Sequence, residues 1–148
     1  MVSGVRQVMY LLDTVAISEG AKLKQDRGYA DFIQGTSPDS KLISVASIAE
    51  LRYGLNLLPD GKRKVALESW VETTEQEFSD RTLEVEGQRV IVWGTLRAGM
   101  QKQGFTIAYN DLLISATAQY YDLTVVTRNV RDFAPTGCKL LNPWEPTS

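Results

Sequence analysis

The segment Asp111-Leu-Leu-Ile-Ser-Ala-Thr-Ala118 (DLLISATA) is the stretch that decides the fold. Its apolar side chains cover so much of a helix circumference that the sequence predicts a central helix, buried on most sides. The segment begins with a carboxylate, Asp111. A negative side chain is favourable in the first turn, because the unpaired N–H groups and the positive end of the helix dipole lie there. This structural explanation is sufficient for Asp111 alone. A functional role would be indicated only if other polar residues lay at the same edge of the fold.

Short apolar runs alternate with longer amphipathic segments along the rest of the chain. The runs predict strands at Val8–Leu12, Lys41–Val45, Arg81–Val85, Leu123–Thr127 and Lys139–Leu141. Such alternation indicates the α/β class, with a mostly parallel central sheet between two layers of helices. We expect a single domain over residues 1–148, with residues 1–7 as a disordered lead.

The amphipathic segments predict the helices between these strands. Val15–Gly20 is expected to turn away from the first strand, and residues 35–40 to form a loop. Ser47 and Glu50 match a capping box, with Ser47 as the N-cap and Glu50 at the third helical position. The predicted helices are Lys22–Gln34, the segment from Ser47 to Leu58, Lys62–Phe78 with Val65 facing inward, Val90–Lys102, and the Asp111 helix ending near Tyr121.

The composition excludes several classes of site. The 148 residues include no histidine, which excludes His bases, Ser–His and Cys–His pairs and His-ligated zinc. The single cysteine, Cys138, excludes an internal disulfide and indicates a reducing compartment, so we expect a cytoplasmic protein. No apolar run approaches the length of a membrane span. A net charge of −2 argues against a wide basic surface for nucleic acid, but not against a local one.

Polar residues with oxygen ligands follow several predicted strands. Asp13 follows the first strand, Glu50 lies in the first turn of the helix after the second, and Asp111 begins the central helix. Asn129 and Asp132 come just after the last strong strand. Because the carboxyl ends of parallel strands share one edge of a sheet, we expect these side chains to gather there.

Each of these residues also has a purely structural explanation. Asp13 and Asn129 are common turn residues, Glu50 completes a capping box, Asp111 complements the dipole, and Asp132 is a solvated charge. Three carboxylates in one crevice, however, repel each other unless a cation neutralises them. Hard oxygen ligands without His or Cys indicate Mg²⁺ or Mn²⁺. Such a metal suits water activation and phosphoryl-oxygen stabilisation, as in metal-dependent nucleases.

Several segments resemble the signature blocks of one family, in order and at the expected spacing. LLDT, SIAELRYG, NDLLISATA and LTVVTRNVRDF resemble PIN-domain ribonucleases, and within them the VapC-type toxins of the FitB-like branch. LLPDGKRK, the WG pair and LLNPW also resemble that branch. These segments lie at Leu11–Thr14, Ser47–Gly54, Asn110–Ala118, Leu123–Phe133, Leu57–Lys64, Trp93-Gly94 and Leu140–Trp144.

The resemblance implies a compact α/β/α PIN fold with an acidic pocket for Mg²⁺ or Mn²⁺. It also implies an endoribonuclease toxin that acts on RNA, a homodimer, and a small antitoxin that inserts a basic residue into the pocket. The matching catalytic and metal-holding residues are Asp13, Glu50, Asp111 and Asn129, with Asp132 as the alternative fourth ligand and Thr14 and Thr127 as supporting hydroxyls.

Val15 departs from the family pattern, which usually has Asn or another small polar residue there. The same residue argues against phosphatase-like folds, which need a second acid at that position. Response-regulator receivers need an acidic pair near Asp13 and a lysine after the late strand, and both are missing. A PIN-like module that binds RNA or a partner without cleavage stays an alternative. Candidate RNA contacts, which can equally be solvated charges, are Lys22, Lys24, Arg27, Arg52, Arg128 and Arg131.

Overall fold

A computed structural model describes residues 7–146, so the predicted lead lies outside the described residues except for Gln7. Its centre is a five-stranded sheet in the order β3-β2-β1-β4-β5, and every neighbouring pair is parallel. Tyr10 of β1 is in register with Lys41 of β2 on one side and Thr124 of β4 on the other. The strands are β1 (Tyr10–Leu12), β2 (Lys41–Ser44), β3 (Thr82–Leu83), β4 (Thr124–Val126) and β5 (Lys139–Leu141).

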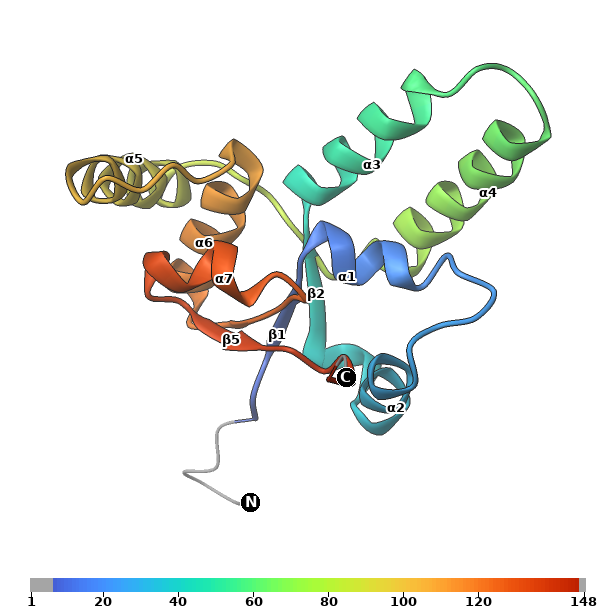
Figure 1. Cartoon of the computed structure of the whole chain (residues 1–148), viewed down its shortest axis with the longest axis horizontal. Coiled ribbons are helices and arrows are strands. Elements are labelled where there is room, and N and C mark those ends of the chain that lie inside the picture. The colour runs from blue at the N-terminus through green and yellow to red at the C-terminus, as the bar shows by residue number, and fades with distance from the viewer. Residues whose placement is uncertain (1–6, 147–148) are drawn as a thin grey trace.

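Helices cover both faces of this sheet (Figure 1). They are α1 (Thr14–Glu19), α2 (Arg27–Gly35), α3 (Val45–Leu57), α4 (Lys62–Glu77), α5 (Gln88–Lys102), α6 (Tyr109–Tyr121) and α7 (Val130–Phe133), with 3-10 turns η1 (Pro38–Ser40) and η2 (Ala134–Thr136). Between residues 7 and 146, no helix has both the length and the apolar character needed to cross a membrane.

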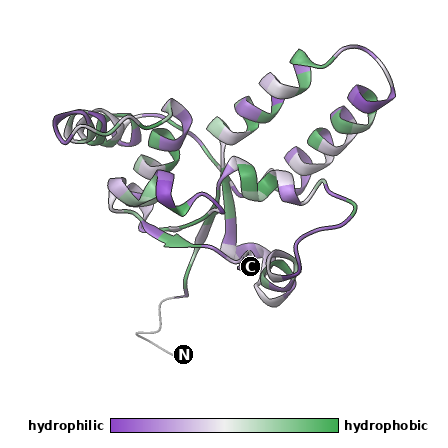
Figure 2. Ribbon diagram, in the orientation of Figure 1, coloured by the Kyte–Doolittle hydropathy of each residue, from purple (hydrophilic) through white to green (hydrophobic). Residues whose placement is uncertain are grey.

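Two hydrophobic clusters, one on each face, hold the three layers together. Leu12 joins Ile17, Tyr29 and Phe78 in the cluster beneath α1, α2 and α4. Its neighbour Leu11 points to the opposite face and packs among side chains of α6, β4 and α7. This alternation is the period of two expected for a strand covered on both sides. The middle of α1 is hydrophobic in Figure 2, and it is the part that lies against the sheet. The predicted α/β/α architecture is confirmed.

The predicted central helix is also confirmed. Helix α6 contributes six buried residues, and they include small and polar side chains as well as aliphatic ones. Thr117, for example, is fully buried, and its hydroxyl donates to the Leu113 carbonyl at 2.8 Å. The buried set is Leu112, Ile114, Ser115, Ala116, Thr117 and Ala118. Because most of α6 is buried against its neighbours, its first turn, which carries Asp111, is held in a fixed position.

The early helices differ from the sequence prediction. Residues 15–20 do not simply turn away, because Asp13 caps a short helix, α1, over Thr14–Glu19. Helix α2 begins at Arg27 rather than Lys22, since Asp26 is its N-cap and accepts from the Tyr29 N–H at 3.0 Å. The predicted basic start of that helix is therefore an exposed loop.

The predicted capping box of α3 is wrong. Strand β2 continues directly into the helix, so the last extended residue, Ser44, is the N-cap and accepts from the Ala46 N–H at 3.0 Å. Ser47 is consequently inside the helix and fully buried, and Glu50 lies in the second turn. The prediction that Val65 faces inward is also wrong, because its side chain is 66% exposed on α4.

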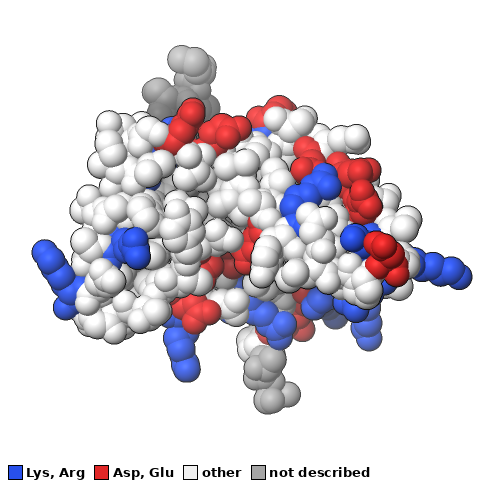
Figure 3. All heavy atoms as spheres, turned by 90° about the horizontal axis from the view of Figure 1, so that it is seen from above, with Lys and Arg blue, Asp and Glu red and all other residues white. Residues whose placement is uncertain are grey.

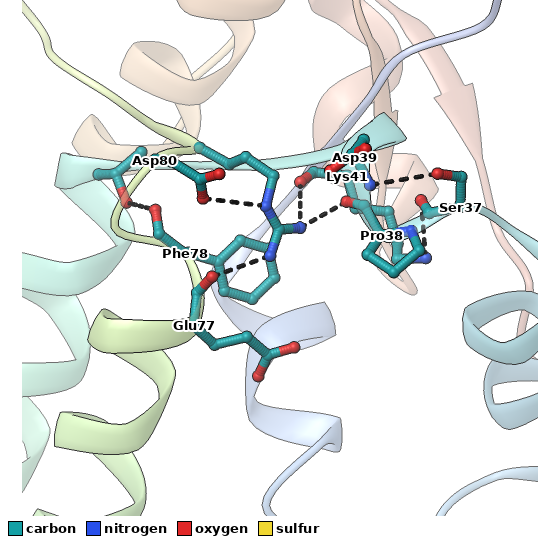
Figure 4. Close-up of polar contacts among 9 residues, drawn as sticks. Ser37, Pro38, Asp39, Lys41, Glu77, Phe78 and Asp80 are labelled. Carbon is teal, nitrogen blue, oxygen red and sulfur yellow. Dashed lines mark hydrogen bonds and ion pairs between the residues drawn. The ribbon is translucent and has the colours of Figure 1, made fainter.

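Two cations, Lys41 and Arg81, anchor the start of β2. Lys41 is only 5% exposed, and its ammonium group donates to the carbonyl and hydroxyl oxygens of Thr36, each at 2.8 Å. The Arg81 guanidinium donates to the carbonyls of Lys41 and Glu77, at 3.1 and 2.9 Å, and to that of Pro38. Figure 4 shows the carbonyl groups of Pro38, Lys41 and Glu77 around the guanidinium group. The cations thus join the ends of α2 and α4 to the sheet.

We predict that Lys41→Met lowers the free energy of unfolding by about 2–3 kcal/mol, because partly buried carbonyl groups lose their charged donor. Lys139→Met is the matched control, since Lys139 also begins a strand but is exposed and paired with Asp122. The control should change stability by roughly 0.5 kcal/mol or less. Urea unfolding of both variants measures the difference. Equal effects would contradict an anchoring role for Lys41.

Candidate active site

Asp13 lies at the carboxyl end of β1 and is 2% exposed. Its backbone N–H donates to the carbonyl of Val126 at 3.1 Å, which ties it to the end of β4. Its Oδ1 accepts from the Ala16 N–H at 2.7 Å, and the Thr127 hydroxyl also donates to the carboxylate. The parallel pairing of β1 with β4 therefore fixes this carboxylate at the sheet edge.

Glu50 approaches the same edge from α3. Its Oε1 accepts from the Thr14 hydroxyl at 2.8 Å and from the Asn110 side-chain amide at 3.2 Å. The Thr14 hydroxyl also lies 3.1 Å from that of Ser47, one turn earlier on α3. Glu50 is thus linked to the first residue of α1 and to the first turn of α6. Both contacts use Oε1, so Oε2 is left for another partner.

Asp111 completes the acidic cluster, which we define as Asp13, Glu50, Asp111 and Asp132. The pKa of Asp111 is raised to about 6, first by burial and then by the negative charges of Asp13, Glu50 and Asp132. The pKa of Asp13 is likewise raised to about 6, mainly by burial and also by the charge of Glu50, although the hydrogen bonds from Thr127 and Ala16 lower it. The acids therefore interact electrostatically, as expected for residues at one edge.

The two candidates for the fourth ligand, Asn129 and Asp132, have fewer contacts with the site than Asp13 and Glu50 have. Asn129 is exposed, and its backbone N–H donates to the Thr127 hydroxyl at 2.9 Å. Among residues 7–146, its side-chain amide makes no hydrogen bond. Asp132 is also exposed, but its charge acts on Asp111. Thr127 connects the two regions, because it contacts both Asp13 and the backbone of Asn129.

The acidic cluster carries uncompensated negative charge. Within the described part of the chain, none of its four carboxylates pairs with a Lys or Arg. In the same part of the chain, no three His, Cys, Asp or Glu side chains are close enough together to hold a metal ion. The donors are all oxygen atoms and the charges are unbalanced, which fits a hard divalent cation that draws the carboxylates together.

Sequence reasoning missed two residues of this site, Asn110 and Ser47. Asn110 holds Glu50, and its position directly before Asp111 at the start of a helix was the available signal. Ser47 was interpreted as a cap, whereas its hydroxyl lies beside that of Thr14. Both are polar residues one turn or less from a predicted acid.

The candidate RNA contacts are only partly free to bind RNA. Lys22 pairs with Glu19 at 2.8 Å, and Arg52 pairs with Glu75. Arg128 lies near enough to Asp26 to lower the pKa of that carboxyl. In the face seen from above in Figure 3, acidic and basic side chains are interspersed, and acidic atoms lie near the middle as well as along parts of the margin. This face therefore shows no continuous basic surface.

Comparison with known proteins agrees with this geometry. The PIN-domain model matches residues 10–136. The VapC ribonuclease Y4jK of Sinorhizobium fredii is 32% identical over 139 residues, covering 93% of this chain and 99% of the relative. The FitB toxin of Neisseria gonorrhoeae is 31% identical over 137 residues, covering 92% and 99%. The crystal structure of FitAcB from the same organism has a TM-score of 0.84 at 30% identity, covering 93% and 100%.

Other solved structures with a similar fold come from toxin–antitoxin complexes. The family match includes the strands β1, β2 and β4 and every member of the acidic cluster. The relatives align with almost the whole chain rather than with one motif. The chain therefore belongs to the PIN-domain family, in the branch that includes VapC ribonucleases and the FitB toxin.

Proposed function

We propose that this protein is a cytoplasmic endoribonuclease that depends on Mg²⁺ or Mn²⁺ and acts as the toxin of a toxin–antitoxin pair. The observation that carries the proposal is the acidic cluster, whose charges no basic side chain of the described residues balances. Relatives named as a ribonuclease and a toxin support the reaction and the role. We take the chain to be one catalytic domain.

Asp13, Glu50 and Asp111 would hold the ion, with Asn129 or Asp132 as a fourth ligand. When bound, the ion would supply Lewis-acid chemistry, activating water and offsetting charge on the phosphodiester. The protein's part is orientation. Thr127 and the Ala16 N–H fix Asp13, while Thr14 and Asn110 hold one oxygen of Glu50 and leave the other available.

A PIN-like module that binds RNA without cleaving it is the competing function. The acidic cluster disfavours it, because like charges that interact this closely disfavour one another's charged forms, and a pure binding module gains nothing from that. Val15, where the family usually has a polar residue, is 40% exposed. Its effect would be the loss of a hydrogen-bonding group near the acidic cluster.

We predict that Asp111→Asn abolishes RNA cleavage in Mg²⁺ while the fold is kept. The same variant should raise the free energy of unfolding of the metal-free protein at neutral pH by about 1 kcal/mol, because it removes a repelling charge. Gel analysis of RNA cleavage and urea unfolding measure the two effects. Cleavage at the wild-type rate by Asp111→Asn would overturn the assignment.

The pH dependence of stability provides the control. The pKa of Asp111 rises from 3.8 to about 6 on folding, so the folded state binds this proton more tightly. The stability that the proton contributes is full below about pH 4 and is lost as the pH rises through about 6. Wild type should therefore lose stability relative to Asp111→Asn across this range. Parallel curves of unfolding free energy against pH for the two proteins would show that the charge of Asp111 does not destabilise the fold.

The fourth ligand can be identified by calorimetric titration of Mn²⁺. Asn129→Asp should tighten Mn²⁺ binding, because it adds a negative charge at the pocket. Asp132→Asn should change binding less, since Asp132 is exposed. A large loss in Asp132→Asn together with no gain in Asn129→Asp would instead make Asp132 the fourth ligand.

The acidic pocket also suits inhibition by an antitoxin. A basic side chain of the partner would pair with the acids and compete with the metal. Beside α1, α2 and α4 lies a cavity of about 230 Å³, whose apolar walls include Ile17, Tyr29 and Trp70. An apolar segment of the same antitoxin would occupy it.

The exposed apolar side chains of α3 and α5 support the further proposal of a homodimer.

We predict that Asp111→Asn weakens binding of the antitoxin encoded beside this protein by roughly tenfold, and that Mn²⁺ weakens wild-type binding. Calorimetry with the purified antitoxin measures both effects. Asp122→Asn is a charge-matched control, because Asp122 lies at the opposite end of α6. Equal affinities for wild type and Asp111→Asn, with no effect of Mn²⁺, would exclude an inhibitor that reaches the acids.

A further inference from the structure

An exposed aromatic group lies beside the acidic cluster and has no role in the functions described above. We define it as the aromatic platform, made of Trp93 and Arg97 on α5 and Tyr109 on α6. The ring centroids of Trp93 and Tyr109 are 5.2 Å apart, and the Arg97 guanidinium carbon lies 5.4 Å from the Trp93 centroid. Tyr109 remains 61% exposed despite this packing. The Tyr109 ring thus contacts Trp93 and is still open to solvent.

The platform adjoins the acids through α6. Tyr109 is the first residue of that helix, Asn110 donates to Glu50, and Asp111 follows. Successive helical residues rise only 1.5 Å along the axis, so the tyrosine lies within the same turn as both site residues. Because side chains two residues apart point to different sides of a helix, an RNA strand would reach Tyr109 by passing from the acidic cluster over the start of α6.

The charge of the platform differs from that of the cluster. Arg97 is exposed, and among residues 7–146 it forms no ion pair with a carboxylate. Beyond Arg97 a hollow of about 150 Å³ continues along α5 toward the exposed ring of Phe105. An aromatic ring, a guanidinium group that forms no ion pair among these residues and a second aromatic ring are the kinds of group that bind the bases and phosphates of a single strand.

We propose that Tyr109 stacks on the nucleobase next to the scissile phosphate of a single-stranded RNA, and that Arg97 contacts the following phosphate. This inference rests on the proposed ribonuclease function and adds to it the position of the adjacent nucleotide. Every base has a π-face, so the platform holds the strand in place without reading its sequence. Trp93 acts as a positioning residue, because its ring contacts the Tyr109 ring.

The test measures binding of a short, fluorescently labelled, unstructured RNA by anisotropy, with Ca²⁺ in place of Mg²⁺ to slow cleavage. Tyr109→Ala should bind roughly tenfold more weakly, and Tyr109→Phe should bind as wild type does. Tyr109→Leu keeps apolar packing on Trp93 but lacks an aromatic face, so it should bind as weakly as Tyr109→Ala. It also covers the case in which the alanine variant fails to fold.

Tyr120→Ala is the matched control. Tyr120 lies at the other end of α6, is 44% exposed, and likewise packs against an aromatic ring and an arginine. It should leave RNA binding unchanged. Equal RNA affinities for Tyr109→Leu and Tyr120→Ala would overturn the proposal. So would a change in oligomeric state in Tyr109→Leu, measured by light scattering, since that would assign the platform to an interface between copies.

A second RNA separates the platform from the proposed function. An abasic nucleotide beside the cleavage site removes the stacking partner, so Tyr109→Leu should then bind as wild type does. A further loss of affinity on the abasic RNA would contradict stacking. If wild type neither binds nor cleaves any RNA, the ribonuclease function fails. If wild type cleaves and the tyrosine variants bind normally, only the platform fails.

Discussion

The parallel pairing of β1 with β2 on one side and β4 on the other is the constraint on which the rest of this structure depends. It brings the ends of three strands to one edge, and Asp13 is held there by a backbone bond to Val126. Because β2 runs directly into α3, the same edge receives Glu50 in the second helical turn. The buried helix α6 supplies Asp111. The acidic cluster thus follows from strand topology rather than from one local motif.

The electrostatics of this edge oppose stability. Asp13 and Asp111 have raised pKa values, which means that their charged forms are disfavoured in the folded protein. The buried charge of Lys41, by contrast, is satisfied by the surrounding carbonyl oxygens. At the candidate site, binding of a divalent cation would relieve the repulsion between the acids.

The sequence predicted the class, the strands and the central helix because each rests on a continuous hydrophobic pattern, as in Leu123–Thr127. It failed where a tertiary contact decides. Ser47 looks like a cap, but β2 ends at Ser44 and the helix begins at the next residue. Ser47 therefore lies inside the helix. Asn110 could not be assigned to Glu50, because its partner lies sixty residues away in the chain and on another helix. The edge at which the acids lie and the supporting hydroxyls of Thr14 and Thr127 were predictable, but the contacts of Asn110 and Ser47 were not.

Anomalous diffraction from crystals grown with Mn²⁺ tests the central claim most directly, since it locates the ion without relying on activity. We expect one strong peak between the carboxylates of Asp13, Glu50 and Asp111, and its loss in Asp111→Asn crystals. The Glu50 oxygen that does not bind Thr14 or Asn110 should face the ion. A Mn²⁺ peak elsewhere, or none at this edge at saturating Mn²⁺, would show that these acids do not hold the metal.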